Sequence, residues 1–304
     1  MNSFLTIHPE LLQALNDDKP IVALESTIIS HGMPYPENVA TAIEVENTVR
    51  ASGAIPATIA IFQGKCHVGL TKEELEYFGH AKDVWKVSLR DMPYVISKSL
   101  YGATTDAATM RIAAMAGIRI FVTGGIGGVH RDASLTMDIS ADLTEMAQTP
   151  VGIVSAGVKS ILDVGLTLEY LETKGIPVIT YGQQEFPSFY SRKSGFISPL
   201  RCDSVQEIAA ILATKWKLGL SGAVLIANPV PADREIAAAE MEVYIQKALE
   251  TVKEKKITGK EVTPFLLKYI AEHTNGESLE TNIALIKHNA KIGAEIAVEY
   301  TGIK

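Results

Sequence analysis

Cysteine is scarce in this chain, and long apolar runs are lacking. Cys66 and Cys202 are the only cysteines among 304 residues, and two cysteines provide neither a disulfide framework nor a zinc cluster. No uninterrupted apolar stretch approaches the ~20 residues that a membrane-spanning helix needs. The sequence therefore predicts a protein that folds without disulfides or structural zinc and that does not cross a membrane.

Positively charged residues are also fewer than negatively charged ones. Lysine and arginine together number 28 against 35 aspartates and glutamates, so the net charge is −7. This balance argues against nucleic acid or an anionic membrane surface as the main partner, but a few cations gathered in one cleft could still bind a small phosphorylated ligand. The N-terminal stretch carries Asp17 and Asp18 where a signal peptide would be apolar. We expect a cytoplasmic protein that acts on a small molecule.

Strand-like apolar runs alternate with amphipathic helical patterns along most of the chain. The runs lie at 20–27, 55–62, 84–88, 118–124, 150–157, 177–182 and 223–228, with helical patterns at 37–53, 102–117 and 204–219. This alternation predicts an α/β fold with a largely parallel sheet covered on both faces. From about residue 232 onward the pattern is almost entirely helical, and no linker or repeat divides residues 1–304. We expect a single domain whose ligand lies at the carboxyl ends of the strands.

Charged and glycine-rich segments follow several of these strands. Glu25 is either a solvated carboxylate or a catalytic acid. The cations Lys86 and Arg90 in KVSLRDM suit an anion such as phosphate, although a surface charge pair with Asp91 explains them equally well. The glycine-dense VTGGIGGVHRD (122–132) matches neither a dinucleotide fingerprint nor a Walker loop. Either a sugar-phosphate cradle or a tight structural turn explains its glycines.

Two carboxylates lie close together in the segment MDISADLTEM. Asp138 and Asp142 would share one face if this segment were helical. Such a pair suits a hard divalent cation that keeps mostly water ligands, such as Mg²⁺ or Mn²⁺. Helix capping by Asp138 or Ser140 is the alternative explanation.

One lysine occupies an unusual place in VSAGVKSILD (154–163), where a strand leads toward a helix. The partial positive charge of a helix N-terminus disfavours an ammonium group. With apolar neighbours as well, Lys159 is expected to have a lowered pKa and a nucleophilic amine. The alternative is a lysine whose amine simply reaches solvent.

These segments together identify a family resemblance that extends over essentially the whole chain. It rests on ALESTIISHGMPYP (23–36), KVSLRDM (86–92), YGATTDAATM (101–110), TGGIGGVHR (123–131), DISADL (138–143), SAGVKSILD (155–163) and FPSFYSRKSGF (186–196). The chain resembles the pseudouridine-5′-phosphate glycosidases of the indigoidine-synthase-A-like family. The resemblance implies a three-layer α/β/α sandwich, a homotrimer and one manganese ion (Mn²⁺) per subunit. It also implies reversible conversion of pseudouridine 5′-phosphate to uracil and ribose 5-phosphate.

The resemblance assigns roles to particular residues. It implies that Lys159 is the nucleophile, Glu25 the proton donor, Lys86 a contact for the substrate phosphate and Asp138 the metal ligand. Further residues implied or considered as substrate contacts are Asp106, Ser140, Ala141, Asp142, Asn282 and His130. Asp106 stands where the family usually has an apolar residue. A backbone contact to the substrate would survive this change, whereas a side-chain carboxylate near the phosphate would repel it.

The chemistry that the resemblance implies explains why a lysine is needed. Pseudouridine joins ribose to uracil by a carbon–carbon bond, so the anomeric carbon has no oxygen or nitrogen leaving group of the kind that ordinary glycosidases protonate. A neutral amine can instead open the ribose ring and form an iminium. Two alternatives stay open: a class I aldolase-like lyase acting on another sugar phosphate, and a non-catalytic sugar-phosphate-binding protein.

Overall fold

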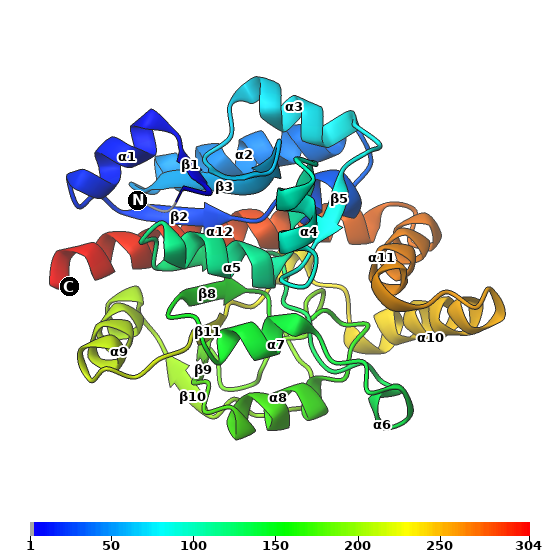
Figure 1. The fold of residues 1–304 in the computed structure, drawn as a ribbon. Coiled ribbons are helices and arrows are strands. Elements are labelled where there is room, and N and C mark those ends of the chain that lie inside the picture. The colour runs from blue at the N-terminus through cyan, green and yellow to red at the C-terminus, as the bar shows by residue number, and fades with distance from the viewer. Residues whose placement is uncertain (1–2) are drawn as a thin grey trace.

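A sheet whose strands run mostly parallel forms the centre of the molecule (Figure 1). The computed structural model describes residues 3–304, and these form an eleven-stranded sheet with the order β1-β4-β3-β2-β7-β8-β11-β9-β10, to which β6 and β5 are added beside β3. The strands are β1 (Leu5–Ile7), β2 (Ile21–Leu24), β3 (Ile55–Phe62), β4 (Lys65–Val68), β5 (Trp85–Val87), β6 (Gly102–Thr104), β7 (Ile120–Val122), β8 (Gly152–Ser155), β9 (Val178–Tyr181), β10 (Leu200–Cys202) and β11 (Val224–Ala227). Only the pairs β3–β4 and β3–β6 are antiparallel among the described strands.

The prediction of a largely parallel sheet is confirmed, and every apolar run named above contains a strand. The central strands β2, β7, β8 and β11 are buried along their whole length, which is why they are continuously apolar in sequence. The short strands β1, β4, β6 and β10 were not predicted. They are three or four residues long, so their pairing depends on neighbours far along the chain rather than on a local pattern.

Helices cover both faces of the sheet. Figure 1 shows the long α12 (Glu277–Ile303) crossing behind its middle strands, with α5 (Asp106–Met115) and α7 (Ala141–Met146) in front. On α12, a Cβ at Gly293 would collide with the Val122 side chain, so glycine lets this helix approach β7 closely. The other helices are α1 (Pro9–Asn16), α2 (Glu37–Ala51), α3 (Lys72–His80), α4 (Met92–Ser97), α6 (Ala133–Thr136), α8 (Val164–Thr173), α9 (Val205–Lys217), α10 (Ala238–Glu254) and α11 (Val262–His273).

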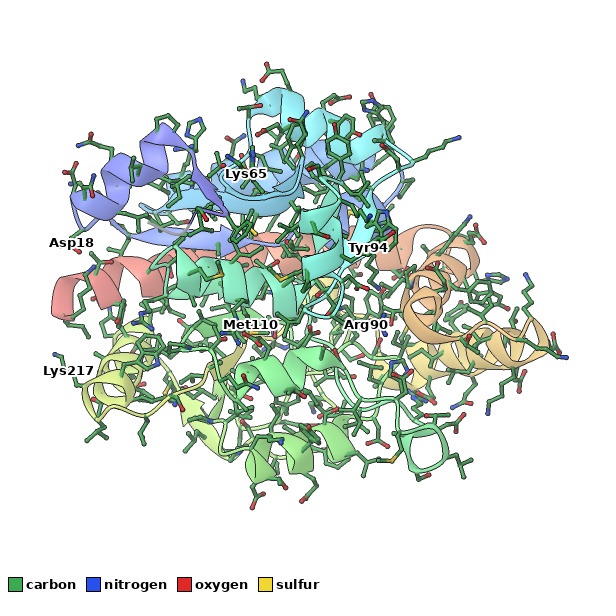
Figure 2. All side chains as sticks on the ribbon, viewed as in Figure 1. Asp18, Lys65, Arg90, Tyr94, Met110 and Lys217 are labelled. Atoms are coloured by element: carbon green, nitrogen blue, oxygen red, sulfur yellow. The ribbon has the colours of Figure 1, made fainter. Side chains whose placement is uncertain are left out.

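The helical C-terminal part is confirmed by α10, α11 and α12, whereas the pattern at 102–117 is helical only from Asp106 onward, because its first residues form β6. Charged side chains such as Asp18 and Lys217 lie at the periphery, and Met110 of α5 lies in the interior (Figure 2). Among residues 3–304, no helix combines the length and the apolarity that crossing a bilayer requires.

A buried amide joins α12 to the carboxyl ends of two strands. The Asn289 side chain is fully buried, and its Nδ2 donates to the carbonyl oxygens of Thr123, at 2.9 Å, and Gly124, at 3.2 Å. Its Oδ1 accepts a hydrogen bond of 3.0 Å from Asn228, which directly follows β11. These bonds hold the loop after β7 in place beneath the helix.

Asn289→Ala is expected to lower the free energy of unfolding by about 2–4 kcal/mol, because it removes the side-chain donor of the buried Thr123 carbonyl and one hydrogen bond each from the Gly124 carbonyl and the Asn228 amide. Urea denaturation would measure the loss. Asn47→Ala on the exposed face of α2 is the matched control, with an expected change within about 0.5 kcal/mol. A similar small change for both variants would contradict this role of Asn289.

Candidate active site

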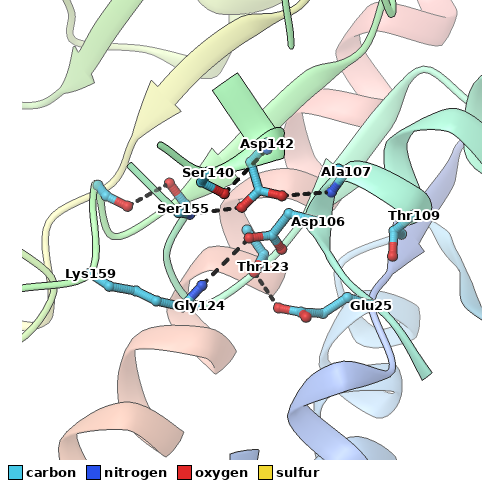
Figure 3. A network of polar contacts seen from close by, with 12 residues as sticks. Glu25, Asp106, Ala107, Thr109, Thr123, Gly124, Ser140, Asp142, Ser155 and Lys159 are labelled. Carbon is cyan, nitrogen blue, oxygen red and sulfur yellow. Dashed lines mark hydrogen bonds and ion pairs between the residues drawn. The ribbon is translucent and has the colours of Figure 1, made fainter. Parts of the chain in front are cut away.

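Side chains from several strand ends converge on one place in the molecule (Figure 3). Glu25 directly follows β2, Thr123 directly follows β7, and Lys159 lies in the loop after β8. Asp106 opens α5, soon after the end of β6. The sheet therefore brings residues that are distant in sequence to its carboxyl edge, which is where open α/β sheets bind ligands.

An ion pair lies at the centre of this group. Lys159 Nζ is 3.5 Å from Asp106 Oδ2, and the two side chains are 20% and 2% exposed, respectively. Asp106 is the first residue of α5, where the partial positive charge of the helix N-terminus favours an anion. The structure thus directs the Asp106 carboxylate toward the lysine.

The expectation of a lowered pKa for Lys159 is wrong. Burial by itself would lower the pKa of this ammonium, but the carboxylates of Asp106, Glu25 and Asp142 outweigh burial, and the net pKa is raised. The helix argument also fails, because α8 begins only at Val164 and Asp163 is its N-cap. The sequence showed the apolar neighbours of the lysine, but not the carboxylates that other segments bring to it.

Asp106 is a buried carboxylate with an unused oxygen. Burial raises its pKa well above the ordinary value, and the negative charge of Glu25 adds to this rise, whereas the charge of Lys159 opposes it. Its Oδ1 has no hydrogen-bond partner among the described residues. Asp106 can therefore accept a further hydrogen bond or a proton.

Glu25 is held by a threonine that the sequence reasoning missed. Thr123 Oγ1 donates a hydrogen bond of 2.5 Å to Glu25 Oε1, and Thr123 lies between the carboxylates of Glu25 and Asp106 (Figure 3). Thr123 is fully buried. Its position at the end of an apolar run was the signal that could have identified it.

Asp142 fastens the glycine-rich loop instead of joining Asp138. Its Oδ1 accepts a hydrogen bond of 2.9 Å from the amide of Ala107, and its Oδ2 accepts one of 2.9 Å from the amide of Gly127. The prediction that Asp138 and Asp142 share a helix face is wrong, because Asp138 lies before α7, which begins at Ala141. The capping explanation is confirmed for Ser140, whose Oγ accepts from the Asp142 amide at 3.2 Å.

The close approach of Asp142 explains one of the glycines. A Cβ at Gly127 would collide with the Ser140 hydroxyl and the Asp142 carboxylate. Gly127 is therefore needed for the packing of the loop against α7. Ala141 is exposed at the first position of this helix.

Asp138 and His130 form a second, more exposed group. His130 Nε2 lies 3.7 Å from Asp138 Oδ2, and the Asp138 side chain is 44% exposed. Among residues 3–304, no cluster of three or more His, Cys, Asp or Glu side chains has a geometry ready for a metal ion. A single exposed carboxylate does fit a hard divalent cation whose remaining ligands are water.

Two further predicted residues lie beside the central group. Lys86 of β5 has a pKa lowered by burial and, in addition, by the positive charge of Lys159, so the two ammonium groups face the same region. Asn282 of α12 is 8% exposed, and its Oδ1, which has no partner among the described residues, lies 3.5 Å from the Cβ position of Gly124. Its open oxygen could accept a hydrogen bond from a ligand.

Comparisons with known proteins show which family the chain belongs to. The model of the family described as indigoidine synthase A like protein matches residues 10–299. A pseudouridine-5′-phosphate glycosidase from Nocardioides sp. is 57% identical over 300 residues, which are 99% of this chain and 98% of the relative. An enzyme of the same name from Deinococcus radiodurans is 58% identical over 300 residues, covering 99% of this chain and 96% of the relative.

Solved structures show the same fold. A prealnumycin C-glycosynthase in complex with ribulose 5-phosphate matches with a TM-score of 0.92 and 36% identity, covering 100% of this chain and 99% of the other. An indigoidine synthase A-like protein from Thermotoga maritima matches with a TM-score of 0.90 and 38% identity, covering 98% and 97%. This chain belongs to the indigoidine synthase A-like family.

Proposed function

We propose that this protein is a pseudouridine-5′-phosphate glycosidase that reversibly cleaves its substrate to uracil and ribose 5-phosphate. The observation that carries the proposal is a partly buried lysine amine placed among carboxylates at the carboxyl ends of the strands. Near-full-length relatives that bear this enzyme name support the substrate. A lyase acting on another sugar phosphate would use the same lysine, but the names of the relatives favour the glycosidase.

Lys159 acts as the nucleophile. The lone pair of its neutral amine forms a bond to C1′ while the C1′–O4′ bond breaks, and O4′ takes up a proton as the ribose ring opens. After the nitrogen loses a proton, its lone pair forms the C=N bond of the iminium. As this C=N bond forms, the C1′–C5 bond breaks, and its electrons pass to uracil, where C5 takes up a proton. Water hydrolyses the iminium to release ribose 5-phosphate and the amine.

Glu25 supplies a proton in this series of reaction steps. Its carboxyl group is oriented by the 2.5 Å hydrogen bond from Thr123, and a fixed acid within reach of the departing atom accelerates such steps. Lys86 lies on β5, where its ammonium would attract the 5′-phosphate by charge. The uracil contacts proposed here are Asn282, through its open Oδ1, and His130.

A divalent cation completes the proposed site. Asp138 would hold Mn²⁺ mostly through water, with Ser140, Ala141 and Asp142 as the adjoining substrate-binding run. When bound, the ion would supply positive charge for the anionic oxygens of the substrate. We also propose that the active form is a homotrimer, which light scattering coupled to size-exclusion chromatography would measure.

Lys159→Ala and Lys159→Arg are both expected to lower the turnover of pseudouridine 5′-phosphate by about 10⁴-fold or more. The arginine variant keeps the charge, but a guanidinium is effectively never neutral and so never nucleophilic. Loss of the C-nucleoside in the presence of Mn²⁺ would be followed by chromatography. Near-normal turnover of Lys159→Arg would exclude the lysine as nucleophile.

Borohydride trapping of the covalent adduct separates the roles of Glu25 and Lys159. Glu25→Gln is expected to keep a borohydride-trapped adduct with ribose 5-phosphate on the Lys159 peptide, while turnover falls about 10²–10⁴-fold, because an amide cannot donate the proton. Mass spectrometry of the trapped protein measures the adduct.

Lys86→Ala is expected to raise KM for pseudouridine 5′-phosphate by about tenfold or more. Any turnover of unphosphorylated pseudouridine should change much less, because the ammonium acts on the phosphate charge. Lys72→Ala, at an exposed position of α3, is the matched control and should change neither. Equal losses on both substrates would rule out Lys86 as the phosphate contact.

Asp138→Asn is expected to weaken Mn²⁺ binding by about 10–100-fold, since it removes the charged oxygen ligand. Electron paramagnetic resonance of free Mn²⁺ during titration measures this affinity without reference to turnover. Chelation should abolish the activity of the unmodified protein, and Mn²⁺ should restore it. Unchanged Mn²⁺ affinity in Asp138→Asn would place the metal elsewhere.

A further inference from the structure

The sequence of steps proposed above leaves one proton without a destination. The amine of Lys159 must be neutral to attack, yet the surrounding carboxylates raise its pKa above the ordinary value, so the resting enzyme holds it as an ammonium group. A base within reach of Nζ is therefore needed to take this proton.

The geometry identifies which carboxylate can serve. Both oxygens of Asp142 already accept backbone amides, those of Ala107 and Gly127. Glu25 accepts the Thr123 hydroxyl and has the role of proton donor. Asp106 is the carboxylate paired with Lys159 Nζ, at 3.5 Å, and its Oδ1 is buried without a partner among the described residues.

We propose that Asp106 is the base that takes the proton from Lys159 as substrate fills the site, an inference that rests on the proposed iminium mechanism. In this step an Nζ–H bond breaks and an Oδ–H bond forms. The electron pair stays on Nζ and then attacks C1′. The pair passes from carboxylate and ammonium to carboxylic acid and amine, so its net charge does not change.

The burial of the pair favours this transfer. Burial penalises charged groups, and a substrate that displaces water from around Nζ increases this penalty for the ion pair but not for the neutral pair. Burial already raises the pKa of Asp106, and the negative charges of Glu25, after β2, and Asp142, on α7, add to the effect. Lys86 on β5 repels the ammonium of Lys159 and so favours its loss of a proton, whereas the two carboxylates oppose that loss.

The pH dependence of adduct formation tests this assignment. Protein and ribose 5-phosphate are mixed between about pH 6 and pH 9, samples are quenched into excess borohydride, and the adduct on the Lys159 peptide is quantified by mass spectrometry. If Asp106 holds the proton internally, the wild-type rate stays nearly independent of pH around neutrality, because the reactive neutral pair and the ion pair contain the same number of protons.

Asp106→Asn removes the base and keeps the shape of the side chain. Its adduct rate is expected to rise about tenfold per pH unit until the amine itself titrates, because solvent must now take the proton, and to lie about tenfold or more below wild type at pH 6. Asp132→Asn, an exposed acid paired with Lys253 at 3.1 Å, is the control and should keep the wild-type profile.

A second variant keeps the test decisive if the asparagine disturbs the fold. Asp106→Ala leaves room for a small acid, and formate should restore its adduct rate several-fold while leaving Asp106→Asn unchanged. A wild-type rate that rises tenfold per pH unit, an Asp106→Asn profile that matches wild type, or a failure of formate to rescue the alanine variant would each overturn the role of Asp106. If wild-type protein formed no adduct at Lys159 at any pH, the iminium mechanism would be wrong, and the role proposed for Asp106 would be wrong as well.

Discussion

The double hydrogen bond to Asp142 is the interaction on which the site depends. One carboxylate accepts the amides of Ala107, at the start of α5, and Gly127, in the loop after β7. Since Asp106 is the residue before Ala107, this contact also determines where the Asp106 carboxylate lies. Charged acceptors of backbone amides form strong hydrogen bonds when buried, so Asp142 can hold three segments, α5, the glycine loop and α7, in one arrangement.

Much of this fold could be predicted because the central strands are buried on both faces and are therefore apolar throughout. The same reasoning located Glu25, Lys86 and Lys159, each at or near the end of a strand. The short strands β4 and β6 could not be predicted, since a segment such as Gly102–Thr104 becomes a strand only by pairing with β3 and β5. Their pattern is set by distant residues rather than by local propensity.

The features of the site that the sequence did not predict correctly have one physical origin. The raised pKa of Lys159, the amide contacts of Asp142 and the Thr123–Glu25 hydrogen bond all join residues that are far apart in sequence. A local stretch such as VSAGVKSILD shows apolar neighbours and suggests a depressed pKa, but charges within a few ångströms outweigh burial when several carry the same sign. The identity of a strand-end residue was therefore easier to predict than its protonation state.

The charge of the assembled site links the proposed roles. Glu25, Asp106 and Asp142 face Lys86 and Lys159, so a fully ionised site carries an excess of negative charge before an anionic phosphate enters. Bringing the phosphate in is costly unless carboxylates are protonated or cations are added nearby. A cation at the proposed Asp138 site would offset part of this negative charge. The proposed proton transfer from Lys159 to Asp106 would leave the total charge unchanged while removing the buried ion pair. Nucleophile activation and binding of an anionic substrate can therefore occur together in this cleft.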